Sequence, residues 1–378
     1  MTSATEGQVR YKRIVAKLGT NLLTAGTDRL DLEVMAGLVG QVARLMAQGH
    51  QIIIVSSGAI AAGRHRLGLG AHRRDIPFRQ VLASVGQSRL MYAYDQLFGS
   101  HGVTVAQTLL TKADLSDRHG YLNARNTLLA LMELKVVPIV NENDVVAIDE
   151  IKEAKFGDND NLSAMVANLV DADLLALLGD TPGLFTCDPH RDPNARLIPR
   201  VERIDADIEA CAGGTEGERG TGGMATKIQA AKLATASGVA VAIADGRQPN
   251  ILARLAQGEA VGTFFSPTST RLESRQRWML SGLARKGRLT VDRGAARALR
   301  EQNRSLLPAG VVAVEGDFGR GEVVDIVDGS GQRLACGIAN YSAEDIARIK
   351  GARSDRISEI LGYEYGAEVV HRNNLAVL

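Results

Sequence analysis

The sequence has few cysteines, no long apolar run and almost no excess of either charge. Its cysteines, Cys187, Cys211 and Cys336, are far apart and form no Cys-x-x-Cys pair, which argues against a disulfide framework and a zinc site. No stretch reaches the roughly 20 apolar residues of a transmembrane helix, and the polar N-terminus lacks the apolar centre of a signal peptide. Lys and Arg number 44 against 43 Asp and Glu, so overall charge predicts neither a nucleic-acid nor a membrane partner. We therefore expect an ordinary cytoplasmic protein.

The first two thirds of the chain alternate β-branched runs with helical periodicity. We expect strands at Arg13–Leu18, Gln51–Ser56, Val103–Thr108, Val136–Val140, Leu174–Leu178 and Val239–Ala244. Helical spacing of apolar residues falls between them, at Leu32–Met46, Val81–Phe98, Tyr121–Leu134 and Asn161–Leu169. A strand, a helix and a further strand make parallel neighbours, so the pattern predicts a three-layer α/β/α sandwich. Ligands of such a fold bind at the carboxyl ends of its strands.

The texture of the sequence changes near Ser266. With 378 residues the chain is longer than an average domain, so two domains are expected. We assign residues 1–265 to the α/β domain, 266–287 to a basic linker and 288–378 to a small β-rich domain. The linker contains Arg271, Arg275, Arg277, Arg285 and Lys286. In the last domain, short strands are expected at Gly310–Glu315, Gly321–Val327 and Arg333–Ile338, separated by tight turns.

The most informative motif is the glycine-rich turn from Gly220 to Lys227, which opens an Ala-rich helical pattern running to about Ser237. Glycines let backbone amides approach an anion closely, and a helix start leaves N–H groups unpaired. Lys227 adds a full positive charge. The turn therefore indicates a phosphate site, with a plain connecting loop as the alternative.

Polar residues also follow the first two expected strands. Lys17-Leu18-Gly19-Thr20 places a lysine beside a glycine turn, from which it could reach phosphates; the alternative is a solvated lysine. After the second strand, the segment Ser56–Gly63 forms a small-residue turn before a helix. Its amides could bind a second anion, either an acceptor carboxylate or the transferred phosphoryl group, and a serine helix cap is the alternative.

Two further strand ends are rich in polar groups. Asn141-Glu142-Asn143-Asp144 follows the fourth expected strand, and the segment Phe156–Asn161 opens the next helix. These carboxylates and amides could pair with a substrate ammonium and orient lysines; a polar turn is the alternative, and the spacing does not fit a calcium loop. Gly179-Asp180, after the fifth strand, is typical of a shelf for adenine and ribose. No Walker lysine is present, because Thr226 precedes Lys227.

Taken in order, these motifs closely resemble the amino-acid kinase family. Within that family they are similar to the members that phosphorylate glutamate. The segment from Arg288 to about Ala367, with Leu307-Pro308-Ala309-Gly310, looks like the PUA domain appended to many of those kinases. Gly179 stands where the family often has threonine, and the loop before Gly157 is longer than in some relatives.

The resemblance implies ATP- and Mg²⁺-dependent phosphorylation of the side-chain carboxylate of L-glutamate, the first step toward proline. Catalytic residues would be Lys17 and Lys227, which stabilise the transferring phosphoryl group, and Asp160, which orients them. Glutamate would be held by Ser57, Asp144 and Asn159. The ATP site would comprise Lys17, Gly179, Asp180, Thr221, Gly222, Gly223, Met224, Ala225, Thr226 and Lys227. No protein ligand for a metal is implied.

Two alternatives remain. The same fold could phosphorylate another acceptor, such as aspartate, N-acetylglutamate, carbamate or uridylate. The chain could instead bind or modify RNA through its PUA-like domain, although residues 288–378 lack the basic excess expected of a nucleic-acid surface. The resemblance further implies feedback inhibition by proline and assembly into dimers or tetramers.

Overall fold

The computed structural model describes residues 10–69, 75–147, 159–189, 191–212, 223–270, 285–302 and 304–377. The chain divides into two compact units, one of Met1–Ser116 with Ala124–Ser269 and one of Asp117–Asn123 with Thr270–Leu378. Most of the expected linker, including Arg271, Arg275 and Arg277, lies outside the described residues, so its bounds stay a prediction. Within the described ranges, no helix is both long enough and apolar enough to cross a membrane.

The described part of the first unit is built on an eight-stranded sheet with the order β3-β4-β2-β1-β5-β7-β8-β6. The strands are β1 Arg13–Leu18, β2 Gln51–Ser56, β3 Val105–Leu110, β4 Val137–Glu142, β5 Leu174–Gly179, β6 Arg200–Val201, β7 Ala240–Asp245 and β8 Thr263–Phe265. Neighbours from β3 to β7 are parallel, as the sequence predicted. The short β8 runs antiparallel to β7, and neither it nor β6 was expected.

The ends of two expected strands lie two residues from those observed, whereas β5 and β7 each differ from expectation by one residue. β3 begins at Val105 and not at Val103, because the Val103 amide donates to the Phe98 carbonyl and belongs to the terminal turn of the preceding helix. β4 continues to Glu142, since Leu109 and Leu110 of β3 pair with Asn141 and Glu142. The first half of the Asn-Glu-Asn-Asp motif therefore lies in the strand, not after it.

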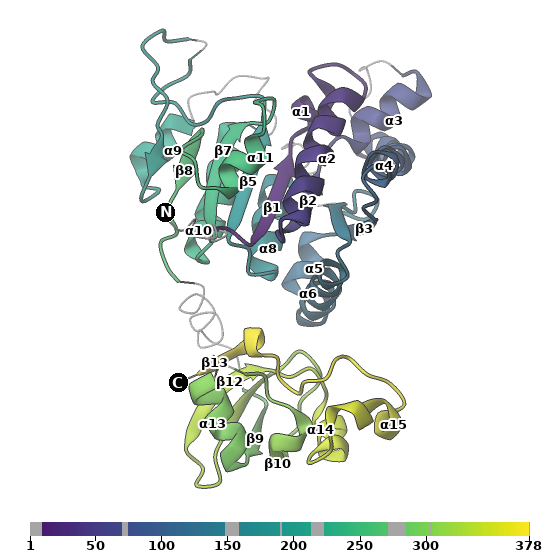
Figure 1. The fold of residues 1–378 in the computed structure, drawn as a ribbon, viewed down its shortest axis with the longest axis vertical. Coiled ribbons are helices and arrows are strands. Elements are labelled where there is room, and N and C mark those ends of the chain that lie inside the picture. Colours follow the sequence, from purple (N-terminus) through teal and green to yellow (C-terminus); the bar gives the residue numbers. More distant parts are fainter. Residues whose placement is uncertain are drawn as a thin grey trace, which may run out of the picture. The chain divides into compact units, whose positions relative to one another are not determined.

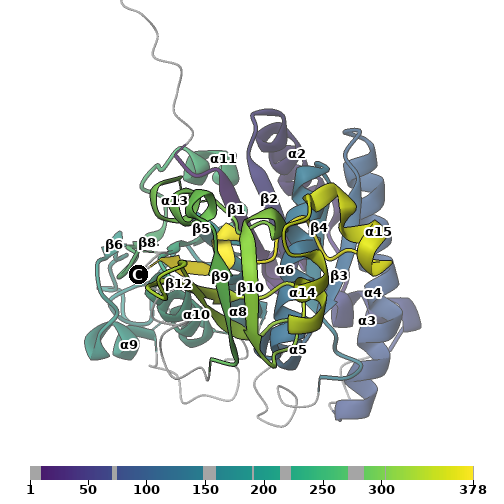
Figure 2. The same ribbon diagram turned by 90° about the horizontal axis from the view of Figure 1, so that it is seen from below.

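Helices cover both faces of this sheet, which confirms the three-layer sandwich (Figures 1 and 2). The helices are α1 Thr20–Thr24, α2 Leu32–Ala47, α3 Ala59–Leu67, α4 Ile76–Gly99, α5 Lys112–Ser116, α6 Arg118–Glu133, α8 Asn159–Leu169, α9 Ala206–Ala212, α10 Met224–Ala236 and α11 Ile251–Ala256. Figure 2 shows α2 and α11 on one side of β1 and β5, with α8 and α10 on the other.

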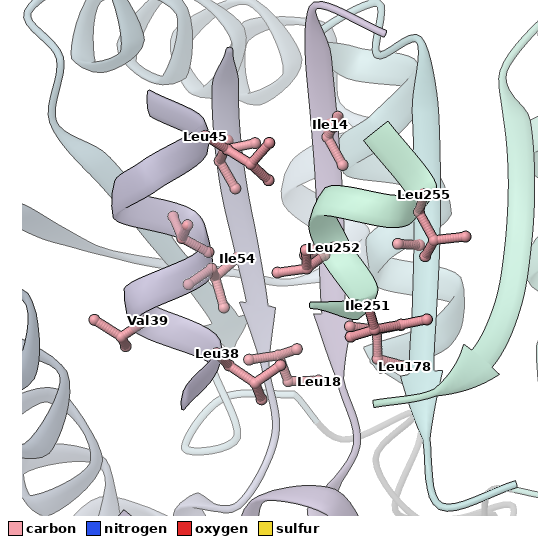
Figure 3. Packing of buried hydrophobic residues seen from close by; sticks show 14 of the residues in the cluster. Ile14, Leu18, Leu38, Val39, Leu45, Ile54, Leu178, Ile251, Leu252 and Leu255 are labelled. Atoms are coloured by element: carbon pink, nitrogen blue, oxygen red, sulfur yellow. The ribbon is translucent and has the colours of Figure 1, made fainter. Parts of the chain in front are cut away.

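The sequence explains why α2 forms and which face it buries. Asp31 caps its start, because one carboxylate oxygen accepts from the amides of Glu33 and Val34, both at 3.0 Å. Gly49, with φ of 91°, lies just beyond its end. Its apolar residues lie at helical spacing and pack on the sheet together with α11 (Figure 3). This is the crossover helix that the spacing predicted.

Side chains along β1 point alternately to the two faces of the sheet, so neighbouring residues contact different helical layers. Ile14, Ala16 and Leu18 belong to the apolar cluster under α2 and α11. Because successive side chains of a strand point to opposite faces, Lys17 must point toward α8 and α10. The fold thereby places a lysine in the layer opposite the main apolar cluster.

The second unit contains a five-stranded sheet, in the order β10-β9-β11-β12-β13, within its described part. The strands are β9 Gly287–Val291, β10 Val311–Gly316, β11 Val323–Val327, β12 Arg333–Ile338 and β13 Leu375–Val377, with helices α13 Arg293–Gln302, α14 Ala343–Ile349 and α15 Ile357–Leu361. Three of these strands were predicted, whereas β9, β13 and the helices were not. Tyr341 ties its core together, donating to the Gly366 carbonyl at 2.6 Å and accepting from the Tyr365 amide at 2.9 Å.

Candidate functional site at the carboxyl edge of the sheet

The candidate site lies where the parallel strands of the first unit end. Lys17 is in register with Val55 of β2 and with Leu177 of β5, so the three strands finish side by side. The Gly19 amide donates to the Leu178 carbonyl at 3.0 Å, and the Ser57 amide donates to the Leu18 carbonyl at 3.1 Å. The helices α3, α8 and α10 all begin at this edge, which therefore offers several helix N-termini to an anion.

A buried aspartate joins two lysines at this edge. Lys17 Nζ lies 2.7 Å from one carboxylate oxygen of Asp160, and Lys227 Nζ lies 3.5 Å from the other. The Thr226 hydroxyl donates to the second oxygen at 2.8 Å. The side chain of Asp160 is only 2% exposed, against 9% for Lys17 and 11% for Lys227. The three predicted catalytic residues are thus brought together from β1, α8 and α10.

The electrostatics of this cluster keep Asp160 charged. Burial by itself raises the pKa of its carboxyl, but the ammonium groups of Lys17 and Lys227 and the hydrogen bonds outweigh it, so the pKa lies below its usual value. Among the described residues, one carboxylate thus pairs with two ammonium groups, and these three side chains together carry a net positive charge. Such a cluster attracts a polyanion without needing a proton to move.

Glycine backbone lies beside both lysines. A Cβ built on Gly179, at the end of β5, would lie 3.6 Å from Lys227 Cε, and one on Gly19 would lie 3.8 Å from Lys17 Nζ. A bulky side chain at either position would occupy the space next to the ammonium groups. The absence of side chains leaves that space to a ligand that approaches the backbone closely.

A chain of side-chain amides extends from the lysine cluster. Asn159, next to Asp160, points its Nδ2 at the Ser56 carbonyl, the Ser57 hydroxyl and Asn141 Oδ1, at 3.0, 3.1 and 3.0 Å. Asn141 Nδ2 in turn donates to Gln87 Oε1 at 2.8 Å. The structure therefore brings together Ser57 and Asn159, two of the predicted substrate residues, and adds Asn141 and Gln87, which the sequence analysis did not assign.

Asp144, the third predicted substrate residue, lies apart from that chain and close to α4. It is half-buried in the turn after β4, where Gln80 Nε2 donates to the Val145 carbonyl at 3.0 Å. Burial lowers the pKa of Arg79, an effect that Arg64 increases and that the nearby carboxylates of Asp144 and Glu142 oppose. The turn that holds Asp144 thus faces a cation of α4 that the sequence analysis also missed.

The expected nucleotide residues are only partly described. Gly179 ends β5, and Asp180 follows it, accepting from Asn21 Nδ2 at 3.1 Å through its side chain and from Arg247 Nη2 at 2.8 Å through its carbonyl. Gly223 caps α10, which begins with Met224, Ala225, Thr226 and Lys227. Thr221 and Gly222 lie outside the described residues. Arg247 could have been found from sequence, since it follows the end of the expected strand Val239–Ala244.

The described residues offer no obvious cage for a metal ion. Nowhere in the described ranges do three or more His, Cys, Asp or Glu side chains gather into a possible site. Asp160 is engaged by two lysines. A divalent cation at this edge would thus depend on the phosphates of a nucleotide for most of its ligands, as Mg²⁺ often does.

Comparison with known proteins links the two units to two families. The profile of the amino acid kinase family matches residues 12–245, and that of the PUA domain matches residues 287–361. The glutamate 5-kinase of Dehalococcoides mccartyi is 59% identical over 97% of this chain and 99% of its own length. Those of Herpetosiphon aurantiacus and Deinococcus radiodurans are 54% and 51% identical, again over 97% of this chain and over 98% and 100% of their own lengths.

Proposed function

The chain belongs to the amino acid kinase family, and we propose that it transfers the γ-phosphoryl group of ATP to the side-chain carboxylate of L-glutamate. The product is γ-glutamyl phosphate, and the reaction is the first step of proline biosynthesis. The observation that carries the proposal is the buried cluster of Lys17, Asp160 and Lys227 at the carboxyl edge of the sheet. Relatives of the same length and domain order are glutamate 5-kinases.

The reaction needs alignment and neutralisation of charge more than it needs a base. A γ-carboxylate oxygen of glutamate forms a bond to the γ-phosphorus, and the bond from that phosphorus to the bridging oxygen of ADP breaks. The nucleophile is already an anion, so no proton has to leave it. Lys17 and Lys227 neutralise the negative charge that gathers around the phosphorus, while Asp160 holds both ammonium groups in place.

Substrate and nucleotide reach this cluster from different sides. Ser57 and Asn159 bind glutamate near Asp160, and the carboxylate of Asp144 pairs with the α-ammonium group. On the other side, Gly179, Asp180 and the segment from Thr221 to Lys227 bind ATP. The nucleotide's phosphates would supply most of the ligands of Mg²⁺, and the ion would lower their repulsion toward the attacking carboxylate.

Two properties of the assembled enzyme belong to the same proposal. Proline competes with glutamate, so it raises the KM for glutamate in a titration without lowering kcat. The chain forms dimers or tetramers, which light scattering of the purified protein measures directly. Proline-insensitive turnover would remove the first property, and a monomeric mass would remove the second.

The test of the reaction is Mg²⁺-dependent consumption of ATP with L-glutamate, aspartate, N-acetylglutamate or UMP as acceptor, with hydroxylamine trapping the acyl phosphate that a carboxylate acceptor forms. We expect product with glutamate alone. Lys227→Met should lower kcat by about 10²- to 10³-fold, the range for loss of one electrostatic donor. Lys232→Met is the matched control, because Lys232 is on the same helix but 61% exposed and paired with Glu209. If product forms only with another acceptor, the assignment of glutamate as the substrate is wrong.

A further inference from the structure

One stripe of α4 faces the candidate site with polar side chains. Gln80, Gln87 and Tyr94 are seven residues apart, and positions at this spacing lie on the same face of a helix. Gln80 donates to the Val145 carbonyl, Gln87 accepts from Asn141, and the Tyr94 hydroxyl lies 2.8 Å from the Ser56 hydroxyl. The stripe therefore runs along the ends of β2 and β4, from Ser56 to the turn that holds Asp144.

Backbone groups fix the orientation of every amide in the chain from Asn159 to Gln87. The Ser56 carbonyl can only accept, so Asn159 must present its Nδ2 there. The Glu142 amide can only donate, so Asn141 must present its Oδ1 to it, at 2.9 Å. Asn141 then has only its Nδ2 left for Gln87, which must answer with Oε1.

This arrangement leaves one hydrogen-bond donor and one acceptor of the amide chain without a partner among the described residues. Gln87 Nε2 and Asn159 Oδ1 are shielded from solvent and have no hydrogen-bond partner among the described residues. A buried polar group left without a partner is costly, so native proteins rarely keep one unless a ligand or ordered water satisfies it. Gln87 Nε2 therefore indicates a ligand group that accepts a hydrogen bond at this end of the amide chain, whereas an ordered water can satisfy Asn159 Oδ1.

The place of Gln87 selects the part of the ligand that it meets. The amide chain starts at Asn159, beside the reacting cluster, and ends at Gln87, whose partner Asn141 lies three residues before Asp144. Glutamate bound with its γ-carboxylate at the cluster has its α-carbon groups at this far end. The free N–H of Gln87 fits the α-carboxylate, while Asp144 fits the α-ammonium group.

We propose that Gln87 is a substrate-binding residue, whose Nε2 donates a hydrogen bond to the α-carboxylate of glutamate. The inference rests on the proposed function and adds a contact that selects an α-amino acid over a simple carboxylate. Asn141 is the positioning residue that holds the Gln87 amide in the required orientation.

Two substitutions test this contact. Gln87→Glu keeps an acceptor for Asn141 and removes only the donor, replacing it with a charge that repels a carboxylate. Gln87→Met keeps the length of the side chain and removes the donor without adding charge. We expect the KM for glutamate to rise about 10- to 100-fold, the loss of one hydrogen bond to a charged group. The kcat and the KM for ATP should change by less than about threefold.

A substrate analogue separates the proposed contact from general damage to the pocket. 4-Aminobutyrate lacks the α-carboxylate, so its inhibition constant against glutamate should be nearly the same in wild type and in both Gln87 variants. Ser88→Ala is the control, since Ser88 is the exposed neighbour on α4 and donates to the Val85 carbonyl of its own helix. Thermal unfolding of each variant checks that the fold is retained.

The outcomes are distinct. An unchanged KM for glutamate in the Gln87 variants, or equal losses for glutamate and 4-aminobutyrate, would overturn this inference while wild-type activity with glutamate upholds the proposed function. A wild-type protein that makes no glutamate-dependent hydroxamate would overturn the proposed function itself.

Discussion

The two faces of β1 meet layers of opposite character. Under α2 and α11, Ile14 and Leu18 pack among aliphatic side chains from both helices and the neighbouring strands (Figure 3). On the other face, Lys17 is almost as well buried, yet it meets Asp160 of α8 and, through it, Lys227 of α10. Neighbouring residues of β1 therefore contribute to two different layers. One layer is stabilised by apolar packing, and the other contains buried ion pairs.

The difference shows how the fold divides its tasks. Apolar contacts are non-directional and each buried methylene stabilises, so the α2 and α11 layer can supply stability without a specific geometry. The charged layer is costly, because each buried group must be paired and desolvation opposes it. Concentrating that cost at one strand edge leaves oriented charges at the place where the proposed phosphoryl transfer would need them. Substitutions on the two faces should then separate stability from turnover.

The largest effect is expected for Asp160→Asn. It removes the carboxylate that pairs with two buried ammonium groups, and breaking such a buried pair costs about 3–5 kcal/mol in the free energy of unfolding. Turnover should be lost as well, since the pairing that orients Lys17 and Lys227 toward each other is gone. Chemical denaturation of both proteins at pH 7 measures the difference, with Asp28→Asn, an exposed site, as control.

This difference should also depend on pH. The folded-state pKa of Asp160 lies below its usual value, so its contribution to stability is complete above the unfolded pKa of about 4. It is lost as the pH falls through the lower folded-state value, because protonation then removes the charge that the lysines bind. The gap between wild type and Asp160→Asn should therefore shrink below about pH 4. A gap that stays constant down to pH 3 would contradict the ion-pair account.

On the opposite face, Leu38→Ala should lower stability and leave turnover intact. Leu38 of α2 is 3% exposed and packs in the apolar cluster between this helix and the sheet, so its truncation should cost about 2–5 kcal/mol of unfolding free energy. The KM and kcat measured well below the unfolding midpoint should match wild type. Leu32→Ala on the same helix is the control, since Leu32 is 56% exposed. A fall in kcat without loss of stability would contradict the claim that the apolar face of β1 supports stability and not turnover.

Sequence patterns predicted the apolar layer better than the charged one. The bounds of β1, β2 and α2 follow from local rules of periodicity and capping, which act within a few residues. The start of β3 was misplaced because the Val103 amide closes the terminal turn of the preceding helix on Phe98. The end of β4 was misplaced because the pairing of Glu142 with Leu110 depends on a partner distant in sequence. The antiparallel β8 was missed because three residues carry too little pattern.

The sequence predicted Lys17, Asp160 and Lys227 as site residues, but it did not predict the contacts that join them. Glycines, lysines and amides at strand ends drew attention to Lys17, Asp160 and Lys227, because their residue types are unusual there. The sequence analysis did not identify Gln87, because this residue lies inside an ordinary helical pattern. Only its contact with Asn141 places it near the candidate site. The spacing of Gln80, Gln87 and Tyr94 was the available signal.

Thr226→Val is expected to have the smallest effect of the three, and it asks how much of the charged layer depends on a neutral partner. The substitution keeps the shape of the side chain and removes the hydroxyl that donates to Asp160 at 2.8 Å. Loss of one hydrogen bond to a charged group should cost about 1.5–3 kcal/mol of stability. Thr235→Val on the same helix is the control, since its buried hydroxyl donates to the Ala231 carbonyl. If Thr226→Val lowers kcat and Thr235→Val does not, the hydroxyl helps to orient the carboxylate that holds both lysines. Equal effects on kcat would show that the ion pairs alone orient it.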